Sequence, residues 1–318
     1  STMKQQKTTS QTMNRAFMTA QLTTIARDNF KPAALLKPLL NILARAVMLK
    51  KSAWQSYAEK MVTWINAPIK QAIKTPFSMF AIGNSKLPFL SWSTLPGFNC
   101  PGALECWMAA KGFCYSLKAW RYPAPLFRQL QNTLIERSPA YRGLIHAELK
   151  KLLNSRKFRG QNVPFRLYVD GDFSSLQGLR FWMDTLKKFP QLKAYGYSKS
   201  LHLFKKLDES GYQWPENYAL NLSSGGKYQN GPVFDYVKNM AITRGEFIAV
   251  NTTKDTLKAW KKNKLTAAQR RDIKQQVNSR KTFICPGKCG ECTLIKENPH
   301  ACGNLERFKD IKILIPIH

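Results

Sequence analysis

Short apolar segments alternate with longer amphipathic segments through the second half of this chain. Segments typical of strands lie at 165–169, 193–197, 218–222, 246–250 and 281–284, and helix-like stretches lie near 174–188, 200–210, 230–240 and 253–278. This alternation predicts βαβ units and therefore a parallel sheet. Repeated right-handed crossovers can close into a full or partial barrel, and an open doubly wound sheet is the alternative. The predicted fold class is α/β, a parallel (β/α) partial barrel.

The chain before this region has a different character and predicts a second part. Residues 1–14 are polar and basic, as expected of a flexible arm. From Arg15 to Lys74, apolar residues recur at three- and four-residue steps, and several prolines interrupt them, which predicts two or three helices. We therefore expect a basic helical accessory region at 1–75 and the partial barrel at 76–318. Residues 77–82 would form its first strand, and a basic helical stretch would follow at 124–156.

The seven cysteines of the chain fall into two groups. We call Cys100, Cys106 and Cys114 the three-cysteine group, and Cys285, Cys289, Cys292 and Cys302 the four-cysteine group. The odd number suits disulfide pairing poorly, and clustered cysteines in a reducing compartment more often bind metal. We therefore predict that both groups are metal or iron–sulfur ligands.

The four-cysteine group has the CxxxCxxC spacing of a compact site, followed by a fourth cysteine. Four thiolates complete either a [4Fe-4S] cluster or a tetrahedral zinc site, and the spacing slightly favours the cluster. A cluster held by only three cysteines would keep one iron open. Alternatively His146, His202 or His300 supplies a fourth ligand. One or two clusters, with zinc as the alternative, are therefore predicted.

The charge of the chain is strongly positive. Lys and Arg number 50 against 19 Asp and Glu, which gives a formal net charge of +31. A polyanion would neutralise this charge, so nucleic acid is the predicted partner, DNA before RNA. A surface charged only for solubility is the plainer alternative. No apolar run spans a bilayer and no signal peptide is evident, so we expect a cytoplasmic protein that does not bind membranes.

Two segments carry the candidate nucleic-acid contacts. A basic stretch with an interleaved tryptophan can grip phosphates and stack a base, and the basic arm can lie along a backbone. The predicted contact residues are Lys4, Lys7, Arg15, Lys258, Trp260, Lys261, Lys262, Lys264, Arg270, Arg271, Lys274 and Arg280.

Polar residues follow several predicted strands, at the edge where ligands gather in parallel sheets. Asp170 and Asp172 follow 165–169 and are candidate catalytic residues, because two carboxylates can hold a divalent metal for phosphodiester cleavage. Asp172 also suits the N-cap of the next helix, the role that we favour for it. The glycine-rich loop at 223–227 could hold a phosphate, although such loops are more often simple turns.

Several of these motifs occur together in one known family. They are Gly83-Asn-Ser-Lys-Leu87 leading to Cys100-Pro-Gly-Ala103, Cys114-Tyr115, Tyr168-Val-Asp-Gly-Asp172-Phe, Tyr195-Gly-Tyr-Ser-Lys199 and the four-cysteine group. Over roughly residues 80–305 the chain resembles the gene-product-eighty-eight family of phages and conjugative plasmids. The resemblance implies a mobile-element context and a distant similarity to radical S-adenosylmethionine partial barrels. The wider spacing of the three-cysteine group differs from the CxxxCxxC of those enzymes.

Three hypotheses follow. The first is an iron–sulfur protein of a plasmid or phage that binds or processes DNA. The second is an enzyme, either a metal-dependent nuclease that uses Asp170 and Asp172 or a radical-type enzyme with an open iron. The third is a nucleic-acid-binding module held together by zinc.

Overall fold

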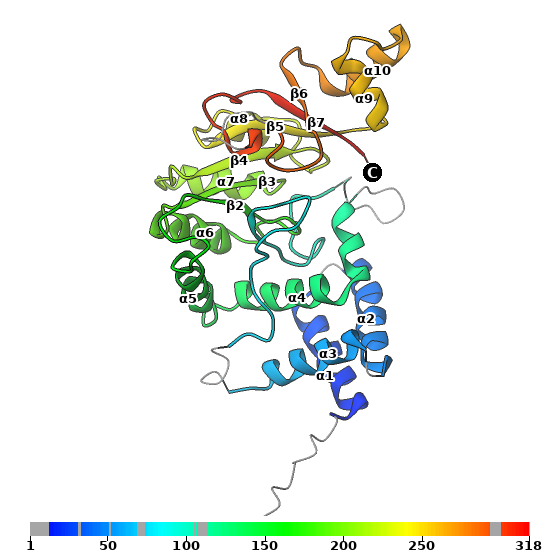
Figure 1. Cartoon of the computed structure of the whole chain (residues 1–318), viewed down its shortest axis with the longest axis vertical. Coiled ribbons are helices and arrows are strands. Elements are labelled where there is room, and N and C mark those ends of the chain that lie inside the picture. Colours follow the sequence, from blue (N-terminus) through cyan, green and yellow to red (C-terminus); the bar gives the residue numbers. More distant parts are fainter. Residues whose placement is uncertain are drawn as a thin grey trace, which may run out of the picture. The chain divides into compact units, whose positions relative to one another are not determined.

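The computed structural model describes residues 13–30, 33–50, 52–68, 74–104, 106, 114–292 and 300–317 (Figure 1). The chain forms two compact units that divide between Pro76 and Phe77. The first unit is helical, and the second is built around a parallel sheet. None of the helices in the described ranges is long and apolar enough to cross a membrane.

The first unit contains α1 (Arg15–Asn29), α2 (Ala33–Met48) and α3 (Ala53–Ile65), which pack against one another. Asn14 caps α1 by accepting hydrogen bonds from the first backbone N–H groups, and Ser52 caps α3 in the same way. Buried apolar residues recur along these helices at three- and four-residue steps, as the sequence predicts. Pro38 lies inside α2, so this proline does not separate two helices.

The second unit holds one seven-stranded sheet in which all neighbouring strands are parallel, and its order is β1-β2-β3-β4-β5-β7-β6. The predicted α/β fold class is thereby confirmed, with β1 and β6 at the two edges of a partial barrel. The strands are β1 (Leu90–Trp92), β2 (Val163–Leu167), β3 (Leu192–Ser198), β4 (Tyr218–Ser223), β5 (Thr243–Val250), β6 (Thr282–Ile284) and β7 (Lys312–Pro316).

Two strands differ from the prediction. The first strand is β1, whereas 77–82 forms only an isolated antiparallel bridge between Ala81 and Ser91. Side chains of α4 (Pro123–Arg137) form hydrogen bonds with the backbone of this segment instead: Gln131 bonds the N–H and the carbonyl of Phe77, and Asn132 bonds the carbonyl of Met79. The second difference is β7, which was not predicted and pairs between β5 and β6.

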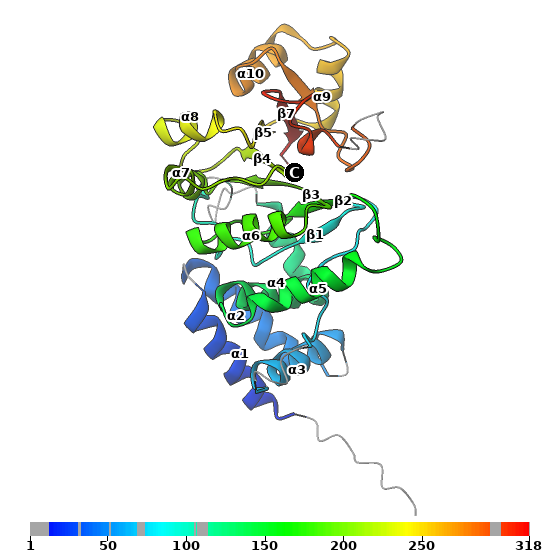
Figure 2. The same cartoon turned by 90° about the vertical axis from the view of Figure 1, so that its left-hand side faces the viewer.

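Helices follow the strands as crossover connections. They are the 3₁₀ helix η2 (Tyr115–Arg121), α4 (Pro123–Arg137), α5 (Arg142–Leu153), α6 (Leu176–Lys188), α7 (Leu201–Glu209), α8 (Pro232–Lys238), α9 (Lys254–Lys261) and α10 (Ala267–Val277). Figure 2 shows α6, α7 and α8 beside the strands that they connect. Trp182 of α6 packs on Phe165 and Phe204 of α7 stacks on Tyr218, so these helices cover one face of the sheet, which we call the outer face.

The opposite, inner face of the sheet is covered by the segment between β6 and β7. Because side chains alternate along a strand, Tyr195 and Ala219 point away from the helices. Together with Ile313 they form a buried cluster with Ala301, Cys302 and Phe308. The 3₁₀ helix η3 (Ala301–Gly303) contacts both β3 and β4. The four-cysteine group is therefore brought to the inner face.

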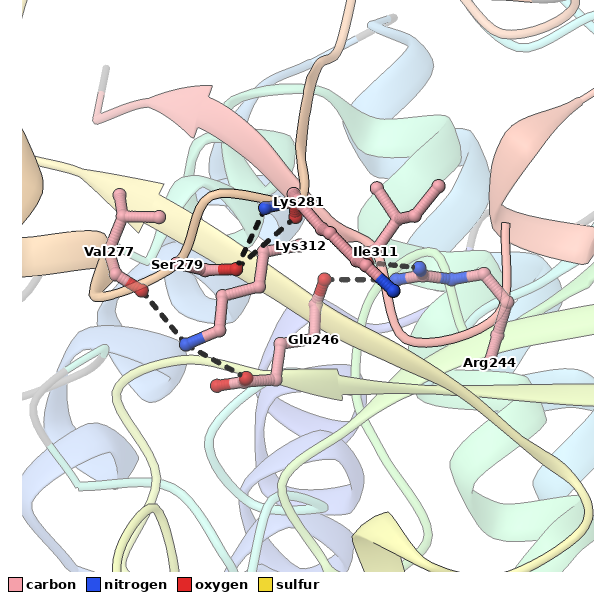
Figure 3. A network of polar contacts seen from close by, with 7 residues as sticks. All are labelled: Arg244, Glu246, Val277, Ser279, Lys281, Ile311 and Lys312. Atoms are coloured by element: carbon pink, nitrogen blue, oxygen red, sulfur yellow. Dashed lines mark hydrogen bonds and ion pairs between the residues drawn. The ribbon is translucent and has the colours of Figure 1, made fainter. Parts of the chain in front are cut away.

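A polar network holds β7 between its two neighbours (Figure 3). Lys312 of β7 forms an ion pair with Glu246 of β5 at 3.1 Å and donates to the carbonyl of Val277 at 2.8 Å. Arg244 of β5 donates to the carbonyls of Ile311 and Glu246. These bonds fix the carboxyl-terminal end of the segment that carries the four cysteines.

Candidate metal centres on the inner face of the sheet

The carboxyl ends of β2, β3 and β4 bring several polar residues to one edge. Asp172 follows β2, Lys199 follows β3 directly, and Ser223 ends β4. The Lys199 ammonium donates to the Ser223 hydroxyl at 2.7 Å. Tyr168, at the start of the loop after β2, has a positive φ of 62°, which is unusual for a bulky residue. This strained turn aims the Asp170–Asp172 loop back across the edge of the sheet.

The loop that begins at Cys100 is fixed over this edge. Ala103 pairs with Gly226 in an antiparallel bridge, and the N–H of Lys227 donates to the carbonyl of Gly102 at 2.8 Å. Gly102 lies so close to β3 that a Cβ there would be 1.8 Å from the carbonyl oxygen of Lys199. Only glycine fits this position, so the motif Cys-Pro-Gly-Ala reflects the close packing of the loop on the sheet.

The three cysteines of the first group lie near one another and near charged residues. Burial raises the pKa of the Cys100 thiol well above its usual value, and the charges of Asp172, Cys114 and Cys106 add to this effect. Burial also raises the pKa of Cys106, while the charge of Lys199 opposes the increase. The N–H of Gly97 points at the Cys100 sulfur at 3.4 Å. A site here would sit between a carboxylate and an ammonium group.

Hydrogen bonds direct the sulfur atoms of the four-cysteine group. The N–H of Gly287 donates to Cys285 Sγ at 3.4 Å, and the N–H of Ala301 donates to Cys292 Sγ at 3.1 Å. The amide of Asn221, on the inner face of β4, donates to the carbonyl of Cys302 at 2.9 Å. Such N–H to sulfur bonds are common around metal-bound thiolates, whose charge they stabilise.

Burial and the neighbouring cysteines both affect the pKa values of thiols in this group. Burial raises the pKa of Cys302 to about 12; the Tyr197 hydroxyl and Arg244 oppose this, and Cys285 and Cys292 add to it. Burial likewise raises the pKa of Cys285, with a further increase from Cys289 and Cys292. Cys285 and Cys302 are therefore neutral thiols at neutral pH unless a cation replaces their protons.

Two arginines flank this group from the sheet. Arg244 of β5 is 0% exposed and binds only neutral oxygens, namely the side chain of Asn221 and three backbone carbonyls. Its charge acts on Cys302. Arg166 of β2 acts on Cys285 and lies over the ring of Tyr197, 4.8 Å from its centroid. Within the described part of the chain, neither arginine forms an ion pair with a carboxylate.

The described residues contain no group of three or more His, Cys, Asp or Glu side chains arranged to hold a metal ion. The four thiols thus share one neighbourhood without converging on a single point. Their chemistry nevertheless fits a thiophilic metal or cluster, since the set is all sulfur, receives backbone N–H groups and faces two cations.

Comparison with known protein families gives one match. The family model described as gene product 88 matches residues 54–303. The chain belongs to the gene product 88 family. No curated protein and no solved structure matched it.

The histidines of this gene product 88 protein have other partners. His300 packs between the rings of Tyr195 and Phe89, and its Nδ1 accepts the N–H of Gly303 at 2.9 Å. Burial lowers its pKa to about 4, so it is neutral. His146 bonds Thr185, and the ring of His202 packs against that of Tyr228. These contacts favour packing roles over ligation.

The two candidate catalytic aspartates have separate partners. Asp172 accepts hydrogen bonds from the Ser198 hydroxyl at 2.7 Å and from the backbone N–H of Lys199 at 2.8 Å. Asp170 accepts from the side chain of Gln129 at 2.9 Å. The expected capping role of Asp172 is wrong, because Ser175 caps α6. Asp172 instead ties the end of β2 to the end of β3.

The glycine-rich loop at 223–227 is not arranged as a phosphate cradle. The N–H of Ser224 donates to Phe247, that of Gly225 to the side chain of Gln229, and that of Lys227 to Gly102. These donors are needed for a phosphate. The loop serves to hold the Cys100 segment.

The basic stretch forms α9, α10 and their flanks. Most of its predicted contact residues are exposed, and of these contact residues only Lys258 forms an ion pair, with Asp255, within the described ranges. Trp260 is only partly exposed and packs against a core cluster of Leu257, Ile273 and neighbouring residues, which leaves less of its ring for stacking on a base. Arg15 begins α1, and Lys4 and Lys7 lie outside the described residues.

Sequence reasoning missed several residues of the site. Arg166 and Arg244 stand at inward positions of otherwise apolar strands, and this placement was the available signal. Glu136 of α4 was also missed; it is 3% exposed and accepts hydrogen bonds from Trp92, Trp182 and Tyr168. It thereby secures the strained residue at the end of β2.

Proposed function

We propose that this protein is an iron–sulfur protein that binds nucleic acid in the cytoplasm, in the context of a phage or conjugative plasmid. Its four-cysteine group would hold one [4Fe-4S] cluster and its three-cysteine group a second. DNA is favoured over RNA as the partner. All seven cysteines are free of disulfides, as suits a reducing compartment.

One observation carries the cluster proposal: two arginines are placed against the four thiols without a carboxylate partner. The buried Arg244 guanidinium is desolvated, which is costly, and the carboxylates that act on it, Asp310 and Glu246, lie beyond ion-pair distance. Thiolates that ligate a metal supply the missing negative charge. Neutral thiols do not, so the arginines favour a metal-bound over a metal-free group.

Besides the positive charge of the arginines, the neighbouring residues offer the hydrogen bonds and the exclusion of water that suit an iron–sulfur cluster. A bound cluster supplies one-electron chemistry whose potential depends on hydrogen bonds to sulfur and on exclusion of water. The N–H groups of Gly287 and Ala301 provide the former. The partly buried or buried rings of Phe89, Phe283 and Phe308 provide the latter.

Metal, iron and sulfide analysis of anaerobically purified protein, with its visible absorption spectrum, tests this part. We expect iron and acid-labile sulfide, and we expect the absorption to decrease in Cys302→Ser and in Cys114→Ser. The Gln275→Ala variant, at an exposed position of α10, is the control and should keep the full absorption. Stoichiometric zinc without iron would establish the zinc alternative, and no metal at all would refute the proposal.

The basic α9–α10 region supports the nucleic-acid part. Exposed lysines and arginines that lack acidic partners favour a polyanion, because binding releases condensed counterions. The triple variant Lys261→Gln, Lys262→Gln and Arg271→Gln should weaken binding of labelled single-stranded DNA. Its slope of log affinity against log salt should fall by roughly 0.7 for each lost phosphate contact.

The matched control removes the same charge elsewhere in the second unit, as Lys150→Gln, Lys151→Gln and Lys188→Gln on α5 and α6. Fluorescence anisotropy over a salt series should give the control the slope of the parent protein. Equal losses in both triple variants would show that only the net charge matters. Affinity that does not depend on salt would contradict nucleic-acid binding.

A second candidate is an enzyme at the three-cysteine group. The observation that favours it is the polar edge around that group, where Lys199 and Ser223 are hydrogen-bonded and Asp172 is close to Cys100. A three-cysteine cluster leaves an open iron for a substrate or for S-adenosylmethionine. Reduced protein that fails to cleave S-adenosylmethionine would remove the radical-type version. The nuclease version is less favoured, since Asp170 and Asp172 bind different partners.

A further inference from the structure

The 3₁₀ helix η2 carries a row of exposed side chains next to the carboxyl edge of the sheet. A 3₁₀ helix has three residues in each turn, so side chains three positions apart lie above one another. Tyr115, Lys118 and Arg121 follow this spacing, and all three are exposed. The exposed Tyr122 directly follows Arg121 and extends the row. We call these four residues the η2 row.

The other sides of η2 are buried and hold the helix in place. Trp120 is buried, and its ring stacks on that of Phe98 with an angle of 12° between the two planes. Ser116 is buried as well, and its side chain is hydrogen-bonded to Asp170. The helix also packs on α4. Because η2 is fixed by these contacts, its exposed row has a defined direction.

Both tyrosines of the row expose much of their rings. Tyr122 is 63% exposed and Tyr115 is 49% exposed. Tyr115 is nevertheless anchored, because its hydroxyl donates to the carbonyl of Val169 at 2.7 Å and accepts from Arg166 at 3.1 Å. A ring whose polar end is anchored while its apolar part stays accessible is suited to pack against another flat ring.

The charge around these rings is positive. No Asp or Glu occurs between Glu105 and Glu136 in the sequence, whereas Lys118 and Arg121 lie between the two tyrosines. Neither of these two cations forms an ion pair within the described ranges. A single exposed apolar residue is ordinary on a protein surface. Two exposed rings that flank two cations are a different feature, because aromatic rings combined with basic groups are what binds single-stranded nucleic acid.

We propose that the η2 row is a second nucleic-acid contact surface, one that binds a single strand. The two tyrosines stack its unpaired bases, and Lys118 and Arg121 contact its phosphates. The bases of a duplex already stack on each other, so the row favours single strands. The inference rests on the nucleic-acid part of the proposed function and needs no bound metal. It adds the form of nucleic acid that is bound, and it brings the strand to the neighbour of Cys114.

Fluorescence anisotropy with three labelled probes tests the row. The probes are an oligothymidylate, an abasic strand with the same number of phosphates, and a duplex of the same length. The parent protein should prefer the oligothymidylate to the abasic strand. The double variant Tyr115→Leu, Tyr122→Leu lacks both rings and should bind the oligothymidylate at least about fivefold more weakly than the parent. Its affinity for the other two probes should not change, so the preference should disappear.

Three further variants serve as controls, and thermal unfolding checks the fold of each. The double variant Tyr115→Phe, Tyr122→Phe keeps both rings and should keep the preference. Tyr122→Leu alone changes a mostly exposed side chain, so it should fold normally and lose part of the preference. The double variant Lys118→Gln, Arg121→Gln should bind both single strands more weakly. Its slope of log affinity against log salt should fall by roughly 0.7 for each lost phosphate contact.

The outcomes separate this inference from the proposed function. A parent protein that binds none of the probes would refute the nucleic-acid part of the proposed function itself. If the parent binds them, equal affinity for the oligothymidylate and the abasic strand would overturn the role of the η2 row. A preference that survives in both leucine variants would overturn it too. The same holds if the phenylalanine variant loses the preference, or if the duplex loses as much affinity as the oligothymidylate when both rings are removed.

Discussion

The two cysteine groups occupy contrasting electrostatic environments in one sheet. The three-cysteine group lies at the carboxyl edge, between the carboxylate of Asp172 and the ammonium of Lys199. The four-cysteine group lies on the inner face, among aromatic rings and next to Arg166 and Arg244. A carboxylate and an ammonium group act on the first group, whereas two arginines act on the second, and the carboxylates nearest to Arg244 form no ion pair with it within the described ranges. The second place is suited to a permanent negative charge, and the first to a centre that meets a ligand.

The largest expected effect comes from Arg244→Met. This change leaves the Asn221 oxygen and backbone carbonyls without their donor and removes a cation next to Cys302. We expect a loss of about 3–5 kcal/mol in the free energy of unfolding, and early loss of the four-cysteine centre. Urea denaturation with visible absorption measures both. Arg271→Met, at an exposed position of α10, should change stability by less than about 0.5 kcal/mol. Similar losses in the two variants would contradict the special role of Arg244.

Gly102→Ala perturbs the three-cysteine group instead. A Cβ at Gly102 collides with the backbone of Lys199, so the Cys100 loop must move away from the strand ends. We expect destabilisation of about 1–3 kcal/mol and loss of the first centre alone.

Gly143→Ala is the control for this change. Gly143 lies in α5, and nothing is within 4 Å of its added Cβ, so the helix should gain about 0.5–1 kcal/mol. If Gly102→Ala kept both centres, close packing of the Cys100 loop would not matter for its cysteines.

Tyr197→Phe removes one hydroxyl that binds the Cys302 sulfur. We expect a loss of about 1 kcal/mol and faster loss of the four-cysteine centre on exposure to a chelator. Tyr195→Phe is the comparison, because its hydroxyl is 3.9 Å from Cys289 Sγ and should matter less. The reverse order of the two variants would refute this description of the sulfur environment.

The smallest expected effect is a pH dependence of the free energy of unfolding that arises from the buried carboxyl group of Glu136. Burial raises the pKa of Glu136, although its hydrogen bonds oppose the increase. A carboxyl with a raised folded-state pKa contributes stability that is complete below its unfolded pKa of about 4.3 and is lost as pH rises through the folded value. The free energy of unfolding of Glu136→Gln should therefore fall less over this interval than that of the parent protein.

Unfolding by urea at a series of pH values measures the difference. Glu216→Gln, at an exposed position, is the control and should follow the parent protein. A steeper fall in Glu136→Gln than in the parent would mean that the buried carboxylate is stabilised in its charged form.

The sequence predicted the repeating part of the fold well and its exceptions poorly. Strands β2 to β6 follow from apolar segments bounded by helices, since local pattern decides them. Strand β7 was not predicted, because it joins the sheet out of sequence order, between β5 and β6. The apolar run at 77–82 suggested a strand, yet amide side chains of α4 satisfy its backbone.

For the candidate site, spacing alone grouped the cysteines as the structure does. Spacing could not show what surrounds them. Arginines within otherwise apolar strands were the available signal, but Arg166 and Arg244 were not singled out, because an arginine in a strand normally faces water. The separation of Asp170 from Asp172 was also hidden, since neighbours in sequence can bond to different elements.

The order of the last strands determines which part of the sheet would be exposed if the cysteine segment detached. Strand β6 joins the sheet only through β7, and the cysteine segment connects these two strands. If that segment came loose, both strands would detach together, and the hydrogen-bonding groups of β5 would be uncovered. An uncovered strand edge recruits other chains. A damaged cysteine segment would thus make the folded protein prone to aggregate.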